Sequence, residues 1–291
     1  FNKLIYQMKI KVYLCGFASP DLNLSVKRFI TQASNLNFYQ EIKVFRPKDF
    51  SEKLRTRISD LFKKGEKKYY GFDIWRPEIL INYLNSLPDN SILQYSDIGC
   101  HFNINGLDRL KDYVKMTEKN NMLAFQYKDP SSEIKKFNYR FQKYMEYEYS
   151  KGDVIKYFGL DFNSEIVNSP QIWGGTFFIK KCDFAFKFFK TWEKANEYIK
   201  LFDDSESKSK NHEKFVGMRG CQSIFSIICK QNNVNSISAS ECEWAEYNGQ
   251  RKWDHLKNYP ILAKRDKKYN ILKRFLNRQK KNLKRFLSKF K

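Results

Sequence analysis

Short apolar runs alternate with amphipathic segments over the first 126 residues, and this alternation is the strongest constraint on the fold. Residues 9–17, 41–45 and 121–126 have the composition of strands, and a further strand ends at Asp97. Between them, residues 26–33, 49–64, 106–118 and a segment from Pro77 have helical periodicity. This order predicts an α/β fold: a mostly parallel sheet with helices on both faces.

The second half is less regular. Residues 128–153 are polar and aromatic, and we expect a partly helical segment that covers a site. Residues 174–181 predict a strand, followed by a long helix with Phe184, Phe188, Trp192, Ala195 and Ile199 on one face. Residues 205–214 predict a solvated, mobile loop, and residues 221–230 a short buried helix. Because no internal repeat or low-complexity linker interrupts the chain, residues 1–262 are interpreted as one domain.

Composition narrows the class of protein. The chain has 291 residues, of which 42% are hydrophobic and 17% aromatic, which excludes wholesale disorder. No apolar run approaches the roughly 18 residues that span a bilayer, and the first residues show no secretory signal. The six cysteines lack metal-type pair spacing, so we expect reduced core residues of a cytoplasmic protein. Phe1 in place of Met indicates a processed or truncated chain.

Positive charge is concentrated at the C-terminus. The formal net charge is +22, and residues 264–291 contribute +12 of it. Leucines and phenylalanines between Leu272 and Phe290 fall on one face at helical spacing, so residues 263–291 predict a basic amphipathic helix. Docking on an anionic membrane, packing on the protein's own body and binding of nucleic-acid phosphates are the three alternatives. We favour the membrane and exclude nucleic acid from the expected partners, because no nucleic-acid module is recognisable.

One carboxylate stands where an apolar run ends abruptly. In SILQYSDIGCHFN, residues 91–103, Asp97 follows the predicted strand and precedes a glycine. In open α/β sheets ligands bind at the carboxyl ends of strands, where a carboxylate can hold a divalent cation against phosphate oxygens. The alternative is that Asp97 only caps the helix that begins near Gly106 or forms a side-chain turn.

Several segments resemble a family of bacterial glycosyltransferases of the GT-A fold found in polysaccharide gene clusters. The segments are GFDIWRPEIL at 71–80, YSDIGCHFN at 95–103, KGDVIKYFG at 151–159, QIWGGTFFIKK at 171–181, LFDDSES at 201–207, QSIFSIICK at 222–230 and NYPILAKRDK at 258–267. The resemblance rests on their order and spacing, because no single segment is a decisive signature. It implies a GT-A-like catalytic domain over residues 1–262 and a nucleoside-diphosphate sugar as donor.

The resemblance also implies a metal site. Sugar transfer releases a diphosphate, whose developing charge requires a divalent metal, positive side chains or both. GT-A enzymes usually carry a D-x-D motif, and the aligned triplet here is Tyr95-Ser96-Asp97. Asp97 is therefore the expected ligand of Mn²⁺ or Mg²⁺, and weak or absent metal dependence is left open. His255 is a candidate second metal ligand, although a lone histidine is more often structural.

Candidates for contacts with the donor come from four segments. Arg28 and Arg76 lie where the family shows basic residues near the nucleotide, and Asp73 and Trp75 are candidates for the base or ribose. Each also has an ordinary alternative, a surface charge for the arginines and a core position for the tryptophan.

Two further segments carry donor candidates. Lys151 and Asp153 stand in a turn that reads K-R-D in relatives and has Gly152 here, so one phosphate contact is in doubt. Gly174 and Gly175 resemble the glycines that let a GT-A strand approach a ligand, or they form a bulge.

The reacting group is the least determined part of the site. Relatives read H-D-Q-S before the buried helix, whereas this chain has Cys221 in place of the acidic residue, and a thiol is a poor substitute for a carboxylate. Gln222 can still bind a sugar hydroxyl, and Asp203 and Asp204 are the candidates for the general base.

These observations predict a glycosyltransferase that acts on capsular or other surface polysaccharide, with a polysaccharide or lipid-linked glycan as acceptor, in the cytoplasm at the inner membrane face. One alternative is transfer of another nucleotide-activated group onto a sugar. The other is a non-catalytic module that binds polysaccharide or membrane, which the altered Tyr95 and Cys221 positions favour.

Overall fold

The central sheet confirms the predicted α/β class. The computed structural model describes residues 10–265 and Gln279, and within them the main sheet has six strands in the order β2-β1-β3-β7-β5-β8. The strands are β1 Val12–Phe17, β2 Glu41–Phe45, β3 Ile92–Ser96, β5 Met122–Gln126, β7 Ile172–Lys180 and β8 Asn235–Ser238. β1 pairs in parallel with β2 and β3, and β5 with β8, whereas β7 runs antiparallel to both of its neighbours.

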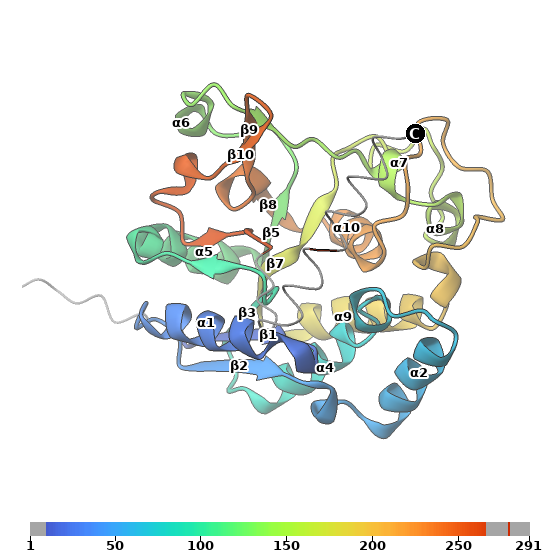
Figure 1. Ribbon diagram of the computed structural model, residues 1–291, viewed down its shortest axis with the longest axis horizontal. Helices are drawn as coiled ribbons and strands as arrows, with labels where there is room; N and C mark the ends of the chain where they lie inside the picture. Colours follow the sequence, from blue (N-terminus) through green and yellow to red (C-terminus); the bar gives the residue numbers. More distant parts are fainter. Residues whose placement is uncertain (1–9, 266–278, 280–291) are drawn as a thin grey trace, which may run out of the picture.

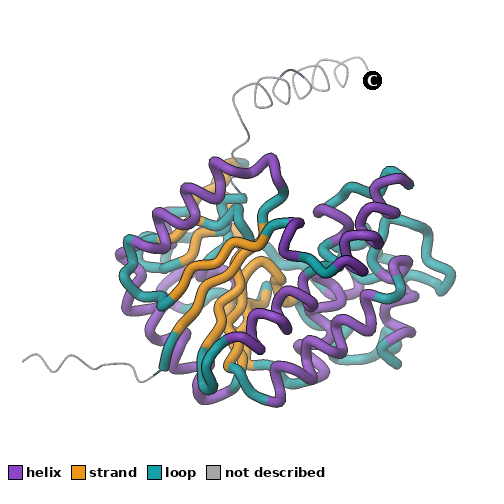
Figure 2. The backbone as a smooth tube through the Cα atoms, turned by 90° about the horizontal axis from the view of Figure 1, so that it is seen from below, coloured by secondary structure: helices purple, strands orange, loops and turns teal. Residues whose placement is uncertain are grey.

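Helices cover both faces of this sheet (Figure 1). α1 Asn23–Ser34 and α5 Leu107–Asn120 pack on one face. α2 Glu52–Lys63, α4 Arg76–Ser86, α9 Asp183–Asn196 and α10 Cys221–Gln231 lie on the other. Figure 2 shows the strands side by side between the two helical layers. The described core is accordingly divided into two hydrophobic clusters, one on each side of the sheet.

Local periodicity accounts for these elements. All six residues of β1 are buried, as expected of a strand that lies inside a sheet with both faces covered. In α1, Phe29 and Ala33 stand four residues apart and are fully buried, so they form the packed face. The helix predicted to reach Ile199 ends earlier, at Asn196, and Ile199 begins a short 3₁₀ turn.

Most short elements were not predicted individually, although α6 and α7 fall within residues 128–153, which were expected to be partly helical. β10 Gln250–Lys252, β9 Ala245–Tyr247 and β6 Arg140–Phe141 form a small antiparallel sheet, and β4 His101–Phe102 pairs with β11 Ile261–Leu262. The short helices are α3 Tyr69–Phe72, α6 Ser132–Lys135, α7 Glu146–Tyr149 and α8 Gly152–Tyr157. The 3₁₀ turns are η1 Pro20–Leu22, η2 Pro47–Asp49, η3 Ile104–Gly106, η4 Ile199–Leu201, η5 Ala239–Glu241 and η6 Asp254–Leu256. Elements this short carry too few residues for a period to be visible.

The C-terminal segment joins the body before the predicted basic helix. Ala263 is buried, and its backbone N–H donates to the Cys242 carbonyl at 2.8 Å. Of the predicted helix at 263–291, residues 263–265 are not helical, and residues 266–278 and 280–291, which contain the Leu272 to Phe290 stripe, lie outside the described residues. Within the described part of the chain, no helix combines the length and the apolar character needed to cross a membrane.

Candidate active site

A cavity of about 890 Å³ opens at the carboxyl edge of the main sheet. Its wall includes the end of β1, the turn that follows β3, and the first half of β7, which starts at this edge because it runs antiparallel. Seven of the predicted site residues line it: Asp73, Trp75, Arg76, Asp97, Gly174, Gly175 and Gln222. Residues that are far apart in the sequence therefore meet where α/β folds bind ligands.

Asp97 stands directly after β3 with its side chain 45% exposed. Its backbone N–H donates to the Gly175 carbonyl at 2.8 Å, and the hydroxyl of Tyr95 donates to Oδ1 at 2.9 Å. The helix near Gly106 does not use Asp97 as a cap, because Asn103 accepts the backbone N–H of Asn105 at the turn that leads into it. The capping alternative for Asp97 is therefore wrong.

Arg76 lies between two carboxylates at the bottom of the cavity. Its Nη2 is 3.3 Å from Asp73 Oδ2 and 3.4 Å from Asp97 Oδ1, and Nη1 donates to the Gly174 carbonyl at 2.7 Å. Burial opposes its charge, but Tyr95 and the carboxylates beside it outweigh burial and hold its pKa well above the usual value. A permanent positive charge is thus fixed beside Asp97.

Gly174 and Gly175 lie where β7 bulges away from β5. Leu123 of β5 pairs with Phe178 of β7, but Phe125 pairs with Trp173, so the residues of β7 between them have only Ala124 opposite. A Cβ on Gly175 would lie 2.2 Å from the Trp173 ring. The Gly174 carbonyl accepts from Arg76, and the Gly175 carbonyl accepts from the Asp97 backbone N–H in continuation of the β3 and β7 pairing, so the backbone at the two glycines supports both residues.

A left-handed turn carries Asp73 into the cavity. Tyr69, Tyr70, Gly71, Phe72 and Asp73 all have positive φ, between 49° and 80°. The Phe72 N–H donates to the Lys68 carbonyl at 2.7 Å, which closes one left-handed helical turn. Such backbone costs roughly 1–2 kcal/mol for each residue other than glycine. Strain of this kind clusters at functional sites.

Asp73 meets Cys221 at the first residue of α10. The Cys221 thiol donates to Asp73 Oδ2 at 3.2 Å. Burial raises the pKa of this thiol well above its usual value, and the Asp73 carboxylate raises it further. Cys221 is therefore a neutral donor, and Asp73 supplies a carboxylate next to the position where the sequence comparison led us to expect an acid.

Trp75 forms part of the cavity floor rather than an exposed stacking surface. Its ring is only 2% exposed and lies 4.0 Å from the ring of Phe17, centroid to centroid. Tyr69 and Tyr70, which were not predicted, are the more accessible aromatic residues of the wall.

Three cations of the cavity wall were also missed. Lys67, Arg219 and Arg265 line it. The guanidinium carbon of Arg219 lies 3.5 Å from the ring centroid of Tyr144 and 4.3 Å from that of Tyr149, and Arg265 donates to Glu243 at 2.8 Å. The aromatic content of residues 128–153 did not indicate that these rings hold Arg219, and the NYPILAKRDK segment, which contains Arg265, indicated no role for that arginine.

Lys151 and Asp203 form a buried ion pair outside the cavity wall. Their side chains are 3% and 9% exposed, and Lys151 Nζ lies 2.9 Å from Asp203 Oδ1. Burial alone raises the pKa of Asp203, but hydrogen bonds from Ser205 and Lys151 outweigh it and lower that pKa below its usual value. A carboxylate held this way is a poor proton acceptor, so the geometry does not favour Asp203 as general base.

Asp153 and Gly152 fasten the loop that was predicted to be mobile. The Asp153 carboxylate accepts the backbone N–H groups of Lys208 and Ser209 at 2.8 and 2.7 Å. A Cβ on Gly152 would lie 2.2 Å from the carbonyl oxygen of Lys210. Glycine at this position therefore permits close packing of the loop, which accounts for the departure from K-R-D.

Three remaining candidates lie outside the cavity wall. Asp204 pairs with Lys68 at 2.6 Å on the surface. Arg28 donates to the carbonyls of Ile98 and Cys100, so it braces the turn after Asp97 from behind. His255 is buried, its Nε2 lies 3.1 Å from the Glu243 carbonyl oxygen, and burial lowers its pKa. The structure does not bring His255 to Asp97.

The residues around Asp97 fit a divalent cation in one mode only. Within residues 10–265, no three His, Cys, Asp or Glu side chains lie close enough together to form a metal site. Mg²⁺ is nevertheless often held by one or two carboxylates together with substrate phosphates and water. Asp97 Oδ1 is engaged by Tyr95 and Arg76, whereas Oδ2 has no hydrogen-bond partner among the described residues. One carboxylate oxygen is thus available to share a cation with a bound phosphate.

Solved glycosyltransferases resemble this fold at low sequence identity. A glycosyltransferase involved in the glycosylation of the major capsid of PBCV-1 matches with a TM-score of 0.46 and 9% identity over 87% of this chain and 91% of that one. Mouse xyloside xylosyltransferase 1 in its apo form matches with a TM-score of 0.40 and 9% identity over 80% of this chain and 87% of that one. Core-mannan synthase A from Aspergillus fumigatus, in an Mn/GDP form, matches with a TM-score of 0.41 and 10% identity over 88% of this chain and 78% of that one. No protein-family model matches the chain, and no curated protein sequence matches it.

Proposed function

We propose that this protein is a glycosyltransferase that moves a sugar from a nucleoside-diphosphate sugar to a hydroxyl of a capsular or other surface polysaccharide. One observation carries the proposal. A single cavity at the carboxyl edge of the sheet combines Asp97 at the end of β3 with the cations Lys67, Arg219 and Arg265. Fixed positive charge stabilises a leaving diphosphate directly, and a strand-end carboxylate can add a divalent cation.

The roles follow from the chemistry of each group. Arg219 and Arg265 present guanidinium groups, which bind phosphate oxygens in pairs. Asp97 shares Mn²⁺ or Mg²⁺ with the diphosphate, and such a cation supplies charge neutralisation when bound. Arg76 already offsets part of the Asp97 charge at 3.4 Å, so we expect weak metal dependence.

Among the described residues, the carboxylates of the cavity wall are Asp21, Asp73 and Asp97. Asp73 lies beside Cys221 and Arg76, deeper than Asp97, with its side chain 14% exposed. Asp73 therefore takes the place of Asp203 and Asp204 as the group that contacts the reacting sugars. Gln222 is proposed to bind a sugar hydroxyl.

The proposed acceptor is a polysaccharide or a lipid-linked glycan, and the proposed location is the cytoplasm at the inner face of the membrane. Support for the membrane comes from the basic Leu272 to Phe290 stripe, an anionic surface being the partner that such a stripe fits. The proposed catalytic domain extends from the predicted residues 1–262 to Arg265, which lines the cavity, and the proposed membrane-binding segment is the remainder of the predicted 263–291.

Thermal unfolding with UDP, GDP, ADP and CDP, each with and without Mn²⁺, tests the proposal. A ligand that binds only the folded state raises the unfolding temperature by mass action. We expect at least one nucleotide to do so, with a further rise in Mn²⁺. No shift with any of the four contradicts an enzyme of this class and favours a binding module. Binding of a nucleotide without turnover of its sugar conjugates favours transfer of another activated group.

A further inference from the structure

Buried side chains behind the cavity determine which end of the Gln222 amide faces it. Gln222 lines the cavity, and its Nε2 donates to Oε1 of Gln171 at 2.9 Å. Gln171 is fully buried and stands just before β7. The two ends of a glutamine amide have nearly the same shape, so hydrogen-bond partners decide its orientation.

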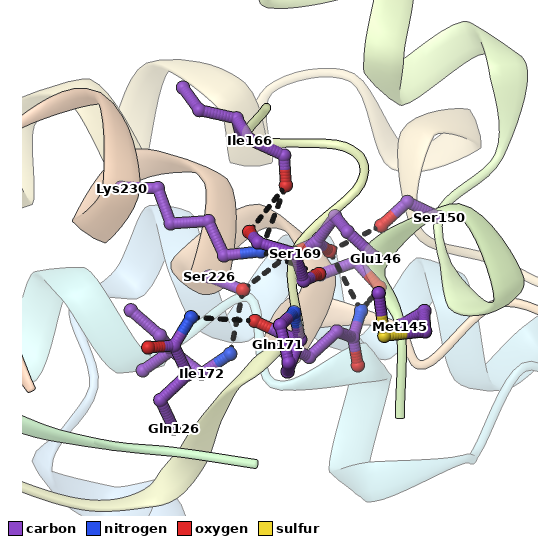
Figure 3. A network of polar contacts seen from close by, with 12 residues as sticks. Gln126, Met145, Glu146, Ser150, Ile166, Ser169, Gln171, Ile172, Ser226 and Lys230 are labelled. Atoms are coloured by element: carbon purple, nitrogen blue, oxygen red, sulfur yellow. Dashed lines mark hydrogen bonds and ion pairs between the residues drawn. The ribbon is translucent and has the colours of Figure 1, made fainter. Parts of the chain in front are cut away.

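Glu146 fixes the orientation of Gln171 (Figure 3). Glu146 is fully buried, and its Oε2 lies 2.7 Å from the ammonium nitrogen of Lys230. Its Oε1 accepts from Gln171 Nε2 at 2.8 Å and from the Ser150 hydroxyl at 2.6 Å. A carboxylate paired with an ammonium group only accepts hydrogen bonds, so Gln171 must present its NH₂ group to Glu146.

Ser223 imposes the same orientation independently. Its hydroxyl donates to the Tyr149 carbonyl at 2.6 Å, so the proton of Ser223 is already used. The Ser223 oxygen then accepts from Gln171 Nε2 at 3.1 Å. If Gln171 turned over, its carbonyl oxygen would face two acceptors in a buried site, which is costly.

We propose that Glu146 and Gln171 are positioning residues that hold Gln222 with its carbonyl oxygen toward the cavity. Because Gln171 offers an acceptor, Gln222 must direct its NH₂ group to Gln171. Its Oε1 is then the atom presented to a ligand, and the ligand group at this position is a hydrogen-bond donor. With the proposed function, on which this part rests, that donor is a sugar hydroxyl and not a phosphate oxygen.

The arginines of the cavity wall, which are hydrogen-bond donors, agree with the assignment of Gln222 as an acceptor. Phosphate oxygens accept hydrogen bonds, so the Gln222 carbonyl oxygen repels them. Arg219 and Arg265 are donors only, and they line the same cavity. The same wall thus carries donors suited to a diphosphate and an acceptor suited to a hydroxyl.

The orientation can be tested without any ligand by Gln222→Glu. The new carboxyl faces the Gln171 acceptor and must keep its proton to form a hydrogen bond, so its pKa rises in the folded state. The variant then loses stability relative to wild type as the pH rises from about 4.3 through the raised pKa. We expect a midpoint about one unit or more above 4.3, measured by urea unfolding between pH 4 and pH 9.

Adding Glu146→Gln should reduce this pH dependence in part, because an amide at 146 removes one of the two acceptors that keep Gln171 from turning over and donating to the new carboxyl, the other being the Ser223 oxygen. Ser226→Ala is the matched control, since Ser226 contacts Oε2 of Glu146 and the Ile172 N–H but has no hydrogen bond to Gln171. It should leave the pH dependence unchanged. Arg76, Arg219, Asp73 and Cys221 line the cavity equally in every background. If Glu146→Gln fails to fold, Gln171→Met removes the acceptor instead and should give the same reduction. If the Gln222→Glu variant shows the same pH dependence with and without each added substitution, the proposal that Glu146 and Gln171 orient Gln222 is overturned.

The hydroxyl assignment is tested by calorimetric titration of Gln222→Met with UDP, UDP-glucose, GDP and GDP-mannose. For a sugar nucleotide that wild type binds, we expect affinity to fall about three- to tenfold, with no change for the matching diphosphate. Equal losses for both overturn the assignment. Absence of nucleotide binding in wild type contradicts the proposed function. The urea unfolding of the Gln222→Glu variants needs no ligand, so it still tests whether Glu146 and Gln171 orient Gln222.

Discussion

The thiol of Cys221 donates to the carboxylate of Asp73 at 3.2 Å, across the base of the cavity. Cys221 is the first residue of α10, and Asp73 ends the left-handed turn before α4. Position 221, where the family resemblance led us to expect an acid, therefore has a carboxylate beside it from a distant part of the chain.

Replacing Cys221 by an acid should act on chemistry more than on nucleotide binding. Cys221→Asp places a second carboxylate against Asp73, so one of the two must hold a proton at neutral pH. We expect turnover to change far more than nucleotide affinity, as compared in steady-state kinetics and calorimetry. Cys221→Asn has the same shape without the charge and is the control. A change in nucleotide affinity alone would show that position 221 does not face the sugars.

Asp97→Asn should weaken nucleotide binding in Mn²⁺ about tenfold and leave the fold intact. The amide keeps the shape of the carboxylate but loses the charge that a hard cation requires. Asp21→Asn, at the exposed rim of the same cavity, should have little effect. Equal affinity of the Asp97 variant and wild type in excess Mn²⁺ would remove Asp97 from the metal site.

Two neighbouring aspartates should differ sharply in their effect on stability. Asp203→Asn leaves the buried Lys151 ammonium without its partner and should cost roughly 3–5 kcal/mol, whereas Asp204→Asn breaks a surface pair with Lys68 and should cost about 1 kcal/mol or less. Because the pKa of Asp203 is lowered in the folded state, its contribution is present above about pH 4 and is lost at lower pH. Urea unfolding at pH 7 and pH 3 should therefore show the difference between the variants shrinking in acid. A difference that persists at pH 3 would contradict the ion pair.

The left-handed turn offers a test of backbone strain. Tyr69 is 49% exposed and has a φ of 49°. Tyr69→Gly should make the protein about 1 kcal/mol more stable than Tyr69→Ala, because only glycine adopts this backbone without a steric cost. Thermal or urea unfolding of the Tyr69→Gly and Tyr69→Ala variants measures this difference in stability. Equal stability would mean that the turn is not left-handed in solution.

Removal of residues 268–291 should abolish binding to anionic liposomes and spare nucleotide binding. The deleted segment carries the Leu272 to Phe290 stripe, and each basic residue near an anionic surface is worth about 1 kcal/mol. Arg265, which lines the cavity, remains in the truncated chain. Liposome binding by the truncated chain would place the membrane contact elsewhere, and loss of folding would show that the stripe packs on the body.

Local periodicity determined much of the fold in advance. The strand at 41–45 coincides with β2, and the segments at 9–17 and 121–126 contain β1 and β5, because a short apolar run bounded by polar residues is a property of neighbouring residues. The end of β3 at Asp97 was equally visible, since a carboxylate that stops an apolar run marks a strand terminus from sequence alone.

Only the tertiary structure decided which charged groups share a site. The sequence does not distinguish the roles of Asp203 and Asp73. Asp203 is paired with buried Lys151, whereas Asp73 reaches the cavity through a left-handed turn. Arg219 gains its place from three tyrosines that precede it in the chain, the last of them Tyr149. Pairings of this kind depend on where distant loops meet, and the energy that selects them comes from burial and hydrogen bonding across the fold. No period along the chain encodes them.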